Sequence, residues 1–179
     1  MTSEDFESLY FEYSDKIYSY IFLYIKNKEI TEDLTHDTFY KAFKNINSFK
    51  GNSTIYTWLI KIARNIVFDH FRRKKVLRFF SIEKHDSRKD EITPQEILIK
   101  GEEVKLLYEA INKLKLEYRE IIILRKIKEL SIKEISIILG WSETKIKNTT
   151  SRALAALREN FPKGEEDFNE KFTEMGKTL

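Results

Sequence analysis

Residues 130–152 restrict the fold of this chain most, because they read as two short helices joined at a glycine. Ser131, followed three residues later by Glu134, forms a capping box, which predicts that the first helix begins there. Gly140 is a residue that adopts positive φ at little cost, as the end of a helix requires. Ser142 can cap the helix that follows. The stretch therefore predicts a helix-turn-helix.

The second of these helices has two different faces. Its apolar residues recur at helical spacing and should face inward: Ile146, Ala153, Leu154 and Leu157. The polar and basic residues around it are candidates to contact the major groove of DNA: Ser142, Thr144, Lys145, Lys147, Asn148, Thr149, Ser151, Arg152 and Arg158. Taken alone, the pattern also fits an αα-hairpin with a solvated polar face.

The composition limits the class of protein. The chain has 179 residues, which allows one domain or two small ones, and it contains no Cys, which excludes disulfides and thiolate metal sites. The longest apolar run, residues 18–25, is less than half a membrane span, and the amino terminus does not resemble a secretory signal. We expect a cytoplasmic protein without membrane insertion, metal or cofactor. A net charge of +3 is too small to indicate nucleic-acid binding by itself.

Sparse Gly and Pro, together with long patterns of period 3.6, predict an all-α protein. The first helix should run from about Ser3 to Lys26 with its aromatic residues in the core. The second should start at a Thr31 cap, and the third should extend from about Thr54 to Phe79. Residues 81–92 are charged and lack an apolar period, as is typical of a linker.

We therefore predict two small helical domains joined by a flexible linker. The first domain covers residues 1–80, the linker residues 81–93, the second domain residues 94–160 and an acidic tail residues 161–179. Thr93-Pro94 combines a cap with a proline at the first helical position, which predicts where the second domain begins. The helix-turn-helix lies at the end of that domain.

A polar stripe runs along the third predicted helix. Its members are spaced by four, four and three residues: Lys61, Asn65, Asp69 and Arg72. Lysine and arginine can neutralise phosphates, and Asn65 can pair with a base edge. Asp69 cannot bind phosphate and should instead orient Arg72 and Arg73. The alternative for the basic residues is an ordinary solvated face.

Three segments of the chain resemble one family. Residues 49–65, with Asp69 and Arg72-Arg73, resemble region 2 of the extracytoplasmic-function (group 4) sigma factors of bacterial RNA polymerase. Residues 31–39 resemble the polymerase-binding part of that region, and residues 114–157 resemble region 4. The recognition helix is similar to that of the sigma-X-like branch of Firmicutes.

The resemblance implies a sigma factor, which binds core RNA polymerase and directs it to promoter DNA. Region 2 would bind the β′ clamp helices through Asp33, His36 and Asp37, and region 4 would bind the β flap and read the minus-35 element. The residues implied in recognising and melting the minus-10 element are Asn52, Ser53, Trp58, Lys61, Asn65, Asp69, Arg72 and Arg73. An anti-sigma factor, commonly membrane-anchored, and a role in stress response are also implied.

Several of these residues have structural alternatives, and the chain departs from the family at several positions. For Asp33, His36 and Asp37 the alternative is a solvated face. Ser53 could instead cap the third helix, and Trp58 could be buried. His36, Asp37 and Lys115 stand where glutamine, glutamate and proline are usual in the family. The rival function is a free-standing helix-turn-helix regulator. We expect no enzyme, because neither a nucleophile constellation nor metal-ligand spacing is present.

Overall fold

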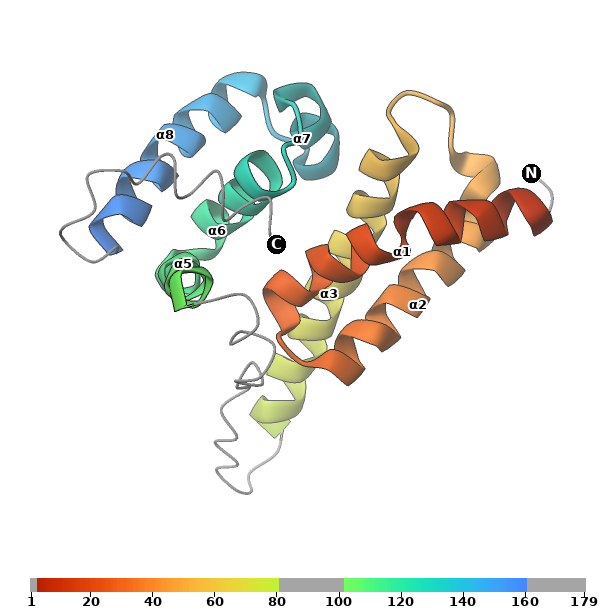
Figure 1. The fold of residues 1–179 in the computed structure, drawn as a ribbon, viewed down its shortest axis with the longest axis horizontal. Helices are drawn as coiled ribbons and strands as arrows, with labels where there is room; N and C mark the ends of the chain where they lie inside the picture. The colour runs from red at the N-terminus through yellow and green to blue at the C-terminus, as the bar shows by residue number, and fades with distance from the viewer. Residues whose placement is uncertain (1–2, 81–101, 161–179) are drawn as a thin grey trace. The chain divides into compact units, whose positions relative to one another are not determined.

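The structure is a computed structural model that describes residues 3–80 and 102–160. The chain divides into two units, Met1–Ile92 and Thr93–Leu179. Within the described residues all regular structure is helical (Figure 1), which confirms the predicted all-α class. The predicted linker, the helix start at Thr93-Pro94 and the acidic tail lie outside the described residues.

The first unit is built from three long helices in its described part. These are α1 (Ser3–Ile25), α2 (Lys28–Asn45) and α3 (Ile55–Phe80), and a short 3-10 helix, η1 (Ile46–Ser48), follows α2. The three long helices pack against one another pairwise (Figure 1). The predicted limits of α1 and α3 are confirmed to within one residue.

The core of the first unit lies between its three long helices, all of which contribute fully buried side chains. Those of α1 are Ile17, Tyr20 and Ile21, those of α3 include Leu59, Ile60, Ala63 and Val67, and α2 contributes Ala42. The aromatic residues of α1 pack against other rings, with 4.8 Å between the ring centroids of Tyr10 and Phe39. Tyr20 and Tyr24 are buried in the core, as predicted, whereas Phe6, Tyr10 and Tyr13 are only partly covered. Phe43 of α2 is 52% exposed.

Helix α2 begins earlier than predicted. Its cap is Asn27, whose side-chain oxygen accepts a hydrogen bond from the backbone N–H of Ile30 at 2.9 Å. Thr31 is fully buried one turn into the helix, and its hydroxyl donates to the Asn27 carbonyl at 2.7 Å. The predicted Thr31 cap is therefore wrong, because asparagine caps a helix at least as well as threonine and stands four residues earlier.

The second unit contains α5 (Glu102–Lys113), α6 (Leu116–Ile122), α7 (Ile132–Leu139) and α8 (Glu143–Asn160) in its described part. Helix α6 continues directly into a π-helical turn, η2 (Ile123–Ile127). Helix α8 packs against α5, α6 and α7. Completely buried side chains come from the different helices: Leu107, Ile121, Ile122, Leu124, Ile135, Ile146 and Leu157.

The predicted helix-turn-helix is confirmed as α7, a short turn and α8. Ser131 accepts the backbone N–H of Glu134 at 3.2 Å, and the Glu134 carboxylate accepts the backbone N–H of Ser131 at 2.8 Å. Gly140 ends α7 at φ 69°, and its N–H donates to the Ser136 carbonyl at 2.8 Å. The turn between α7 and α8 therefore depends on a residue with a left-handed backbone conformation.

Replacement of Gly140 should destabilise the second unit through backbone conformation. A Cβ at this position would meet nothing within 4 Å, so the cost comes from positive φ and not from a clash. We expect Gly140→Ala to lower the free energy of unfolding by about 1 kcal/mol and Gly140→Asn to lower it less, because asparagine tolerates the left-handed region. Urea unfolding followed by circular dichroism measures both variants, and equal losses would contradict this explanation.

Candidate nucleic-acid interface

The loop before α3 leaves its polar groups accessible. Gly51 has φ 71°, which turns the chain, and the Asn52 side chain next to it is exposed. Thr54 caps α3, since its Oγ1 accepts the backbone N–H of Thr57 at 3.1 Å. Ser53 instead donates to the Thr54 carbonyl at 3.2 Å. The alternative in which Ser53 is the cap is therefore wrong, and the capping of α3 leaves the Asn52 side chain accessible.

The polar stripe of α3 lies on the accessible side of the helix. Lys61, Asn65, Arg72 and Arg73 are exposed, while Ala63, Ile66 and Val67 face the core. Exposed cations and an exposed amide along one helix face can contact a nucleic-acid backbone and a base edge together. The stripe thus has the arrangement that the sequence predicted.

Asp69 pairs with one of its two predicted partners. The Arg72 guanidinium donates a hydrogen bond to the Asp69 carboxylate and lowers the pKa of that group below its ordinary value. The charges of Lys41, on α2, and Arg73 lower the pKa further, and partial burial opposes them. Asp69 therefore orients Arg72, whereas Arg73 acts on it only through its charge.

Trp58 is neither fully exposed, as a DNA-stacking residue would be, nor fully buried, as in the structural alternative. The side chain is half-buried, and its ring packs against Phe49 with 5.5 Å between centroids. Phe49 stands just before the Gly51-Asn52-Ser53 loop. Trp58 therefore packs against a residue two positions before the loop and still exposes part of its ring.

The three candidate polymerase-contacting residues share one exposed face of α2. Asp33, His36 and Asp37 are all exposed. The opposite side of this helix buries three threonines, and the hydroxyls of Thr35 and Thr38 each donate to the carbonyl four residues earlier at 2.7 Å. Because those bonds satisfy the buried hydroxyls, the helix can bury its threonines and leave its acids outside.

In the second unit, helix α8 presents most of the predicted DNA-contacting set. Ser142 accepts the backbone N–H of Lys145 at 3.3 Å and so caps α8, as predicted. The following residues are exposed: Ser142, Thr144, Lys145, Lys147, Asn148, Ser151, Arg152 and Arg158. Thr149 is only 7% exposed, because it follows Ile146 by three residues and shares its inward side. The expectation that Thr149 lies on the outward face is wrong.

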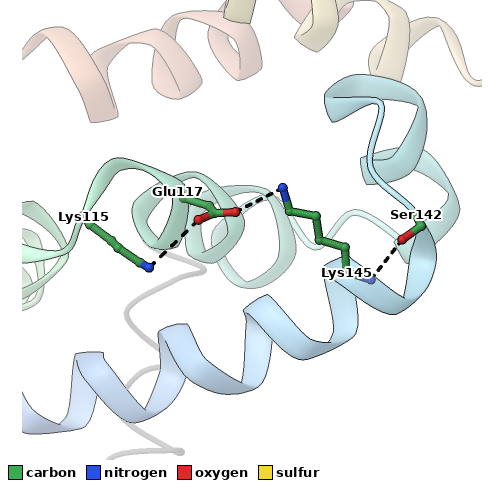
Figure 2. A network of polar contacts seen from close by, with 4 residues as sticks. All are labelled: Lys115, Glu117, Ser142 and Lys145. Atoms are coloured by element: carbon green, nitrogen blue, oxygen red, sulfur yellow. Dashed lines mark hydrogen bonds and ion pairs between the residues drawn. The ribbon is translucent and has the colours of Figure 1, made fainter.

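Residues that the sequence did not indicate adjoin this face of α8. A groove of about 400 Å³ lies between the start of α6 and α8, and Lys115, Glu117 and Tyr118 of the α6 side line it with residues of α8. Figure 2 shows that the Glu117 carboxylate points toward Lys145, with 3.3 Å between Oε1 and Nζ. Glu117 and Lys145 are 28 positions apart, so helical spacing gives no signal for this pair.

Two classes of feature are absent from the described residues. Across residues 3–80 and 102–160, no group of three or more histidines and carboxylates is arranged to hold a metal ion. In the same part of the chain no helix is long and apolar enough to cross a membrane.

Comparisons with known proteins find relatives of both units. Residues 9–76 match the family "Sigma-70 region 2", and residues 105–157 match "Sigma-70, region 4". The chain is 34% identical over 162 residues to the ECF RNA polymerase sigma factor SigX of Bacillus subtilis, covering 88% of this chain and 84% of that protein. It is also 34% identical over 166 residues to the RNA polymerase sigma factor YlaC of the same organism, covering 92% and 96%.

Solved structures with a similar fold include the sigma factor RpoE of Bartonella quintana in complex with the anti-sigma factor NepR. The TM-score is 0.67 at 24% sequence identity, and the match covers 88% of this chain and 96% of that chain.

The Asp69–Arg72 pair can be tested by titration. We expect Arg72→Gln to raise the pKa of Asp69 toward its usual value of about 4, and Arg73→Gln to raise it less, because only Arg72 donates a hydrogen bond. A lowered pKa stabilises the folded state above the unfolded pKa, and that contribution is lost as the pH falls through the folded pKa. Any stability difference between Arg72→Gln and the parent should therefore shrink as the pH falls below about 4.

Carboxyl-carbon NMR of Asp69 in the parent and in both variants measures these shifts. Equal shifts in Arg72→Gln and Arg73→Gln would contradict the assignment of Arg72 as the partner.

Proposed function

This chain belongs to the extracytoplasmic-function sigma factors of RNA polymerase, and we propose that its two helical units divide the work of promoter recognition. As a sigma factor it binds core RNA polymerase and directs initiation at promoters. Residues 1–80 act as region 2, residues 81–93 as a linker and residues 94–160 as region 4. The observation that carries this proposal is the presence, in one chain, of an exposed polar stripe beside an open loop and of a separate helix-turn-helix.

Core polymerase is bound through α2. The acidic face of Asp33, His36 and Asp37 contacts the β′ clamp helices, and the second unit contacts the β flap. A free-standing helix-turn-helix regulator needs no such first unit, so the match of residues 9–76 to region 2 favours the sigma factor over that rival. The protein contributes binding and no catalysis of its own, and it acts in the cytoplasm, where the polymerase is.

The minus-10 element is recognised and melted by the first unit. A base drawn out of the duplex loses a few kcal/mol of stacking, which a pocket must offset. The Asn52 amide and the Ser53 hydroxyl hold that base, while Asn65 and the cations of the α3 stripe hold the flanking strand. Trp58 stacks at the upstream edge of the melted region.

The minus-35 element is read by α8. Residues in the first half of a recognition helix contact base edges, so Lys145 and Asn148 discriminate between sequences. Arg152 and Arg158 lie further along and bind phosphates, which adds affinity and salt dependence. Thr149 is buried and supports the helix from inside.

An anti-sigma factor controls this activity. The solved sigma factor of similar fold was crystallised with such a partner, which supports the proposal. In the family the anti-sigma factor is commonly anchored in the membrane, which would connect the protein to a stress response.

Reversal of charge on the acidic face of α2 should weaken the contact with polymerase. We expect Asp33→Lys with Asp37→Lys to lower affinity for core enzyme by at least about tenfold, because two attractive charge contacts become repulsive. Helix content should not change, since both side chains are exposed. Titration of labelled core polymerase measures the affinity.

A control tests whether the change in net charge alone accounts for the loss of affinity for core polymerase. Glu7→Lys with Asp15→Lys makes the same change of charge at exposed positions of α1, outside the proposed face. Equal affinity of the Asp33/Asp37 variant and the parent, or an equal loss in the control, would show that the assigned face is wrong.

Damage to the base pocket should slow melting more than capture. Asn52→Ala with Asn65→Ala should leave closed complexes nearly normal and abolish the permanganate reactivity of thymines near the start site, because the pocket binds only the unstacked base. A template with a premelted bubble should restore much of the transcription. Asn47→Ala, an exposed asparagine of η1, is the control and should melt promoters normally. An equal defect on premelted and duplex templates would rule out this pocket.

A further inference from the structure

The ammonium group of Lys145 is held at two places in the free protein. Its Nζ lies 3.3 Å from Glu117 Oε1 and 3.8 Å from the centroid of the Trp141 ring. At the other end of the residue, the backbone N–H donates to Ser142 Oγ at 3.3 Å (Figure 2). A flexible side chain on the recognition helix is thus restrained at its base and at its tip.

Glu117 reaches Lys145 from a different helix. It stands in the first turn of α6, which packs against α8. Its second oxygen lies 4.0 Å from Lys115 Nζ, so one carboxylate lies between two cations (Figure 2). Arg152 lines the same groove. Among the described residues that line this groove, Glu117 is therefore the one acid, and the other charged residues are basic.

The carboxylate affects two kinds of DNA acceptor differently. An ammonium group has three N–H donors, so a bond to Glu117 leaves others available. A neutral base edge, such as O6 and N7 of guanine, can accept one of them while the ion pair persists. A phosphate that approaches the same ammonium meets the negative charge of Glu117 and is repelled.

Phosphate contacts position a protein on DNA, and base contacts specify the sequence. A lysine without restraint can satisfy its charge on any phosphate within reach, because its four-carbon stem is flexible and its ammonium is a point charge. Such a contact would add affinity for all sequences alike. A residue that turns Lys145 away from phosphates therefore raises discrimination without a contact of its own to DNA.

We propose that Glu117 is a positioning residue for Lys145 and that, by directing its ammonium to base edges, it sets how strongly this sigma factor discriminates between minus-35 sequences. The proposal rests on the proposed function, in which Lys145 reads a base. Both side chains are about half exposed, at 48% for Lys145 and 39% for Glu117, so the ion pair is accessible to DNA. Its effect is on specificity, because an exposed ion pair contributes little to stability.

The test uses holoenzyme made from core RNA polymerase and the full chain. Promoter duplexes with a randomised minus-35 element are selected with the parent, and binding is then measured for the best selected sequence and for a scrambled one over a range of salt. The variants are Glu117→Gln, Glu117→Asp, Lys145→Ala and the double variant Glu117→Gln with Lys145→Ala. Glu109→Gln, at an exposed position of α5, is the matched control for loss of one negative charge.

Glu117→Gln should reduce the ratio of selected to scrambled affinity by about fivefold, within the range of a single base contact. It should steepen the salt dependence by about the value of one phosphate contact. Glu117→Asp keeps the charge and should fall between the parent and Glu117→Gln. In the Lys145→Ala background Glu117→Gln should have no further effect on the ratio, because coupled residues give non-additive changes.

Three results would overturn the inference, and they separate it from the function on which it rests. If Lys145→Ala loses discrimination while Glu117→Gln matches Glu109→Gln in ratio and salt dependence, Glu117 is not a positioning residue and Lys145 remains a base reader. An equal effect of Glu117→Gln with and without Lys145 would show that it acts elsewhere. Unchanged discrimination in Lys145→Ala would refute the base-reading role itself. Equal unfolding midpoints of all variants exclude misfolding as the cause.

Discussion

Burial of one side of each helix is the constraint on which the rest of this structure depends. In α8 the side chains of Ile146, Ala153 and Leu157 are completely covered. Because a helix is rigid and its residues follow one another at fixed angles, covering these three leaves Lys145, Asn148 and Arg152 accessible. Side chains that are buried in the core cannot contact DNA, so the pattern of burial decides which side chains of the helix can. The same relation holds in α3, where Ala63 and Val67 are buried and Lys61 and Asn65 are exposed.

The buried sides of these helices are not uniformly apolar. Helix α2 covers Thr31, Thr35 and Thr38, whose hydroxyls donate to carbonyls one turn earlier at 2.7 Å. A buried hydroxyl without a partner would cost free energy, and these intrahelical bonds remove that cost. Threonine can therefore belong to the core of a unit in which α2 packs against α1 and α3. The acids Asp33 and Asp37 remain on the other side.

In the proposed function, the two units carry out different tasks. Duplex reading is assigned to α8, a helix with exposed donors in a small packed unit. Holding a displaced base is assigned to the Gly51-Asn52-Ser53 turn and the α3 stripe. A charge that improves one task need not disturb the other. The net charge of +3 is small because the 32 Lys and Arg residues are nearly balanced by 29 Asp and Glu residues.

Much of the fold was predictable because its signals are local. The structure confirms three such signals. The Ser131–Glu134 capping box and the Asp69–Arg72 pair each join residues three positions apart, and Gly140 ends the helix directly before it in the left-handed conformation. Two caps were predicted wrongly, at Thr31 and as an alternative at Ser53. In each case a neighbouring residue competes for the same role, Asn27 in the first and Thr54 in the second, and sequence alone does not rank such neighbours.

The sequence by itself determined the helical class, the order of the two units, the turn of the helix-turn-helix and the polar stripe of α3, since each depends on periodicity or on short-range hydrogen bonds. Only the tertiary structure decided that Trp58 is half-buried against Phe49 and that Glu117 meets Lys145. These outcomes depend on how closely helices approach and at what rotation. That is set by the summed packing of many side chains far apart in the chain, and no local pattern records it.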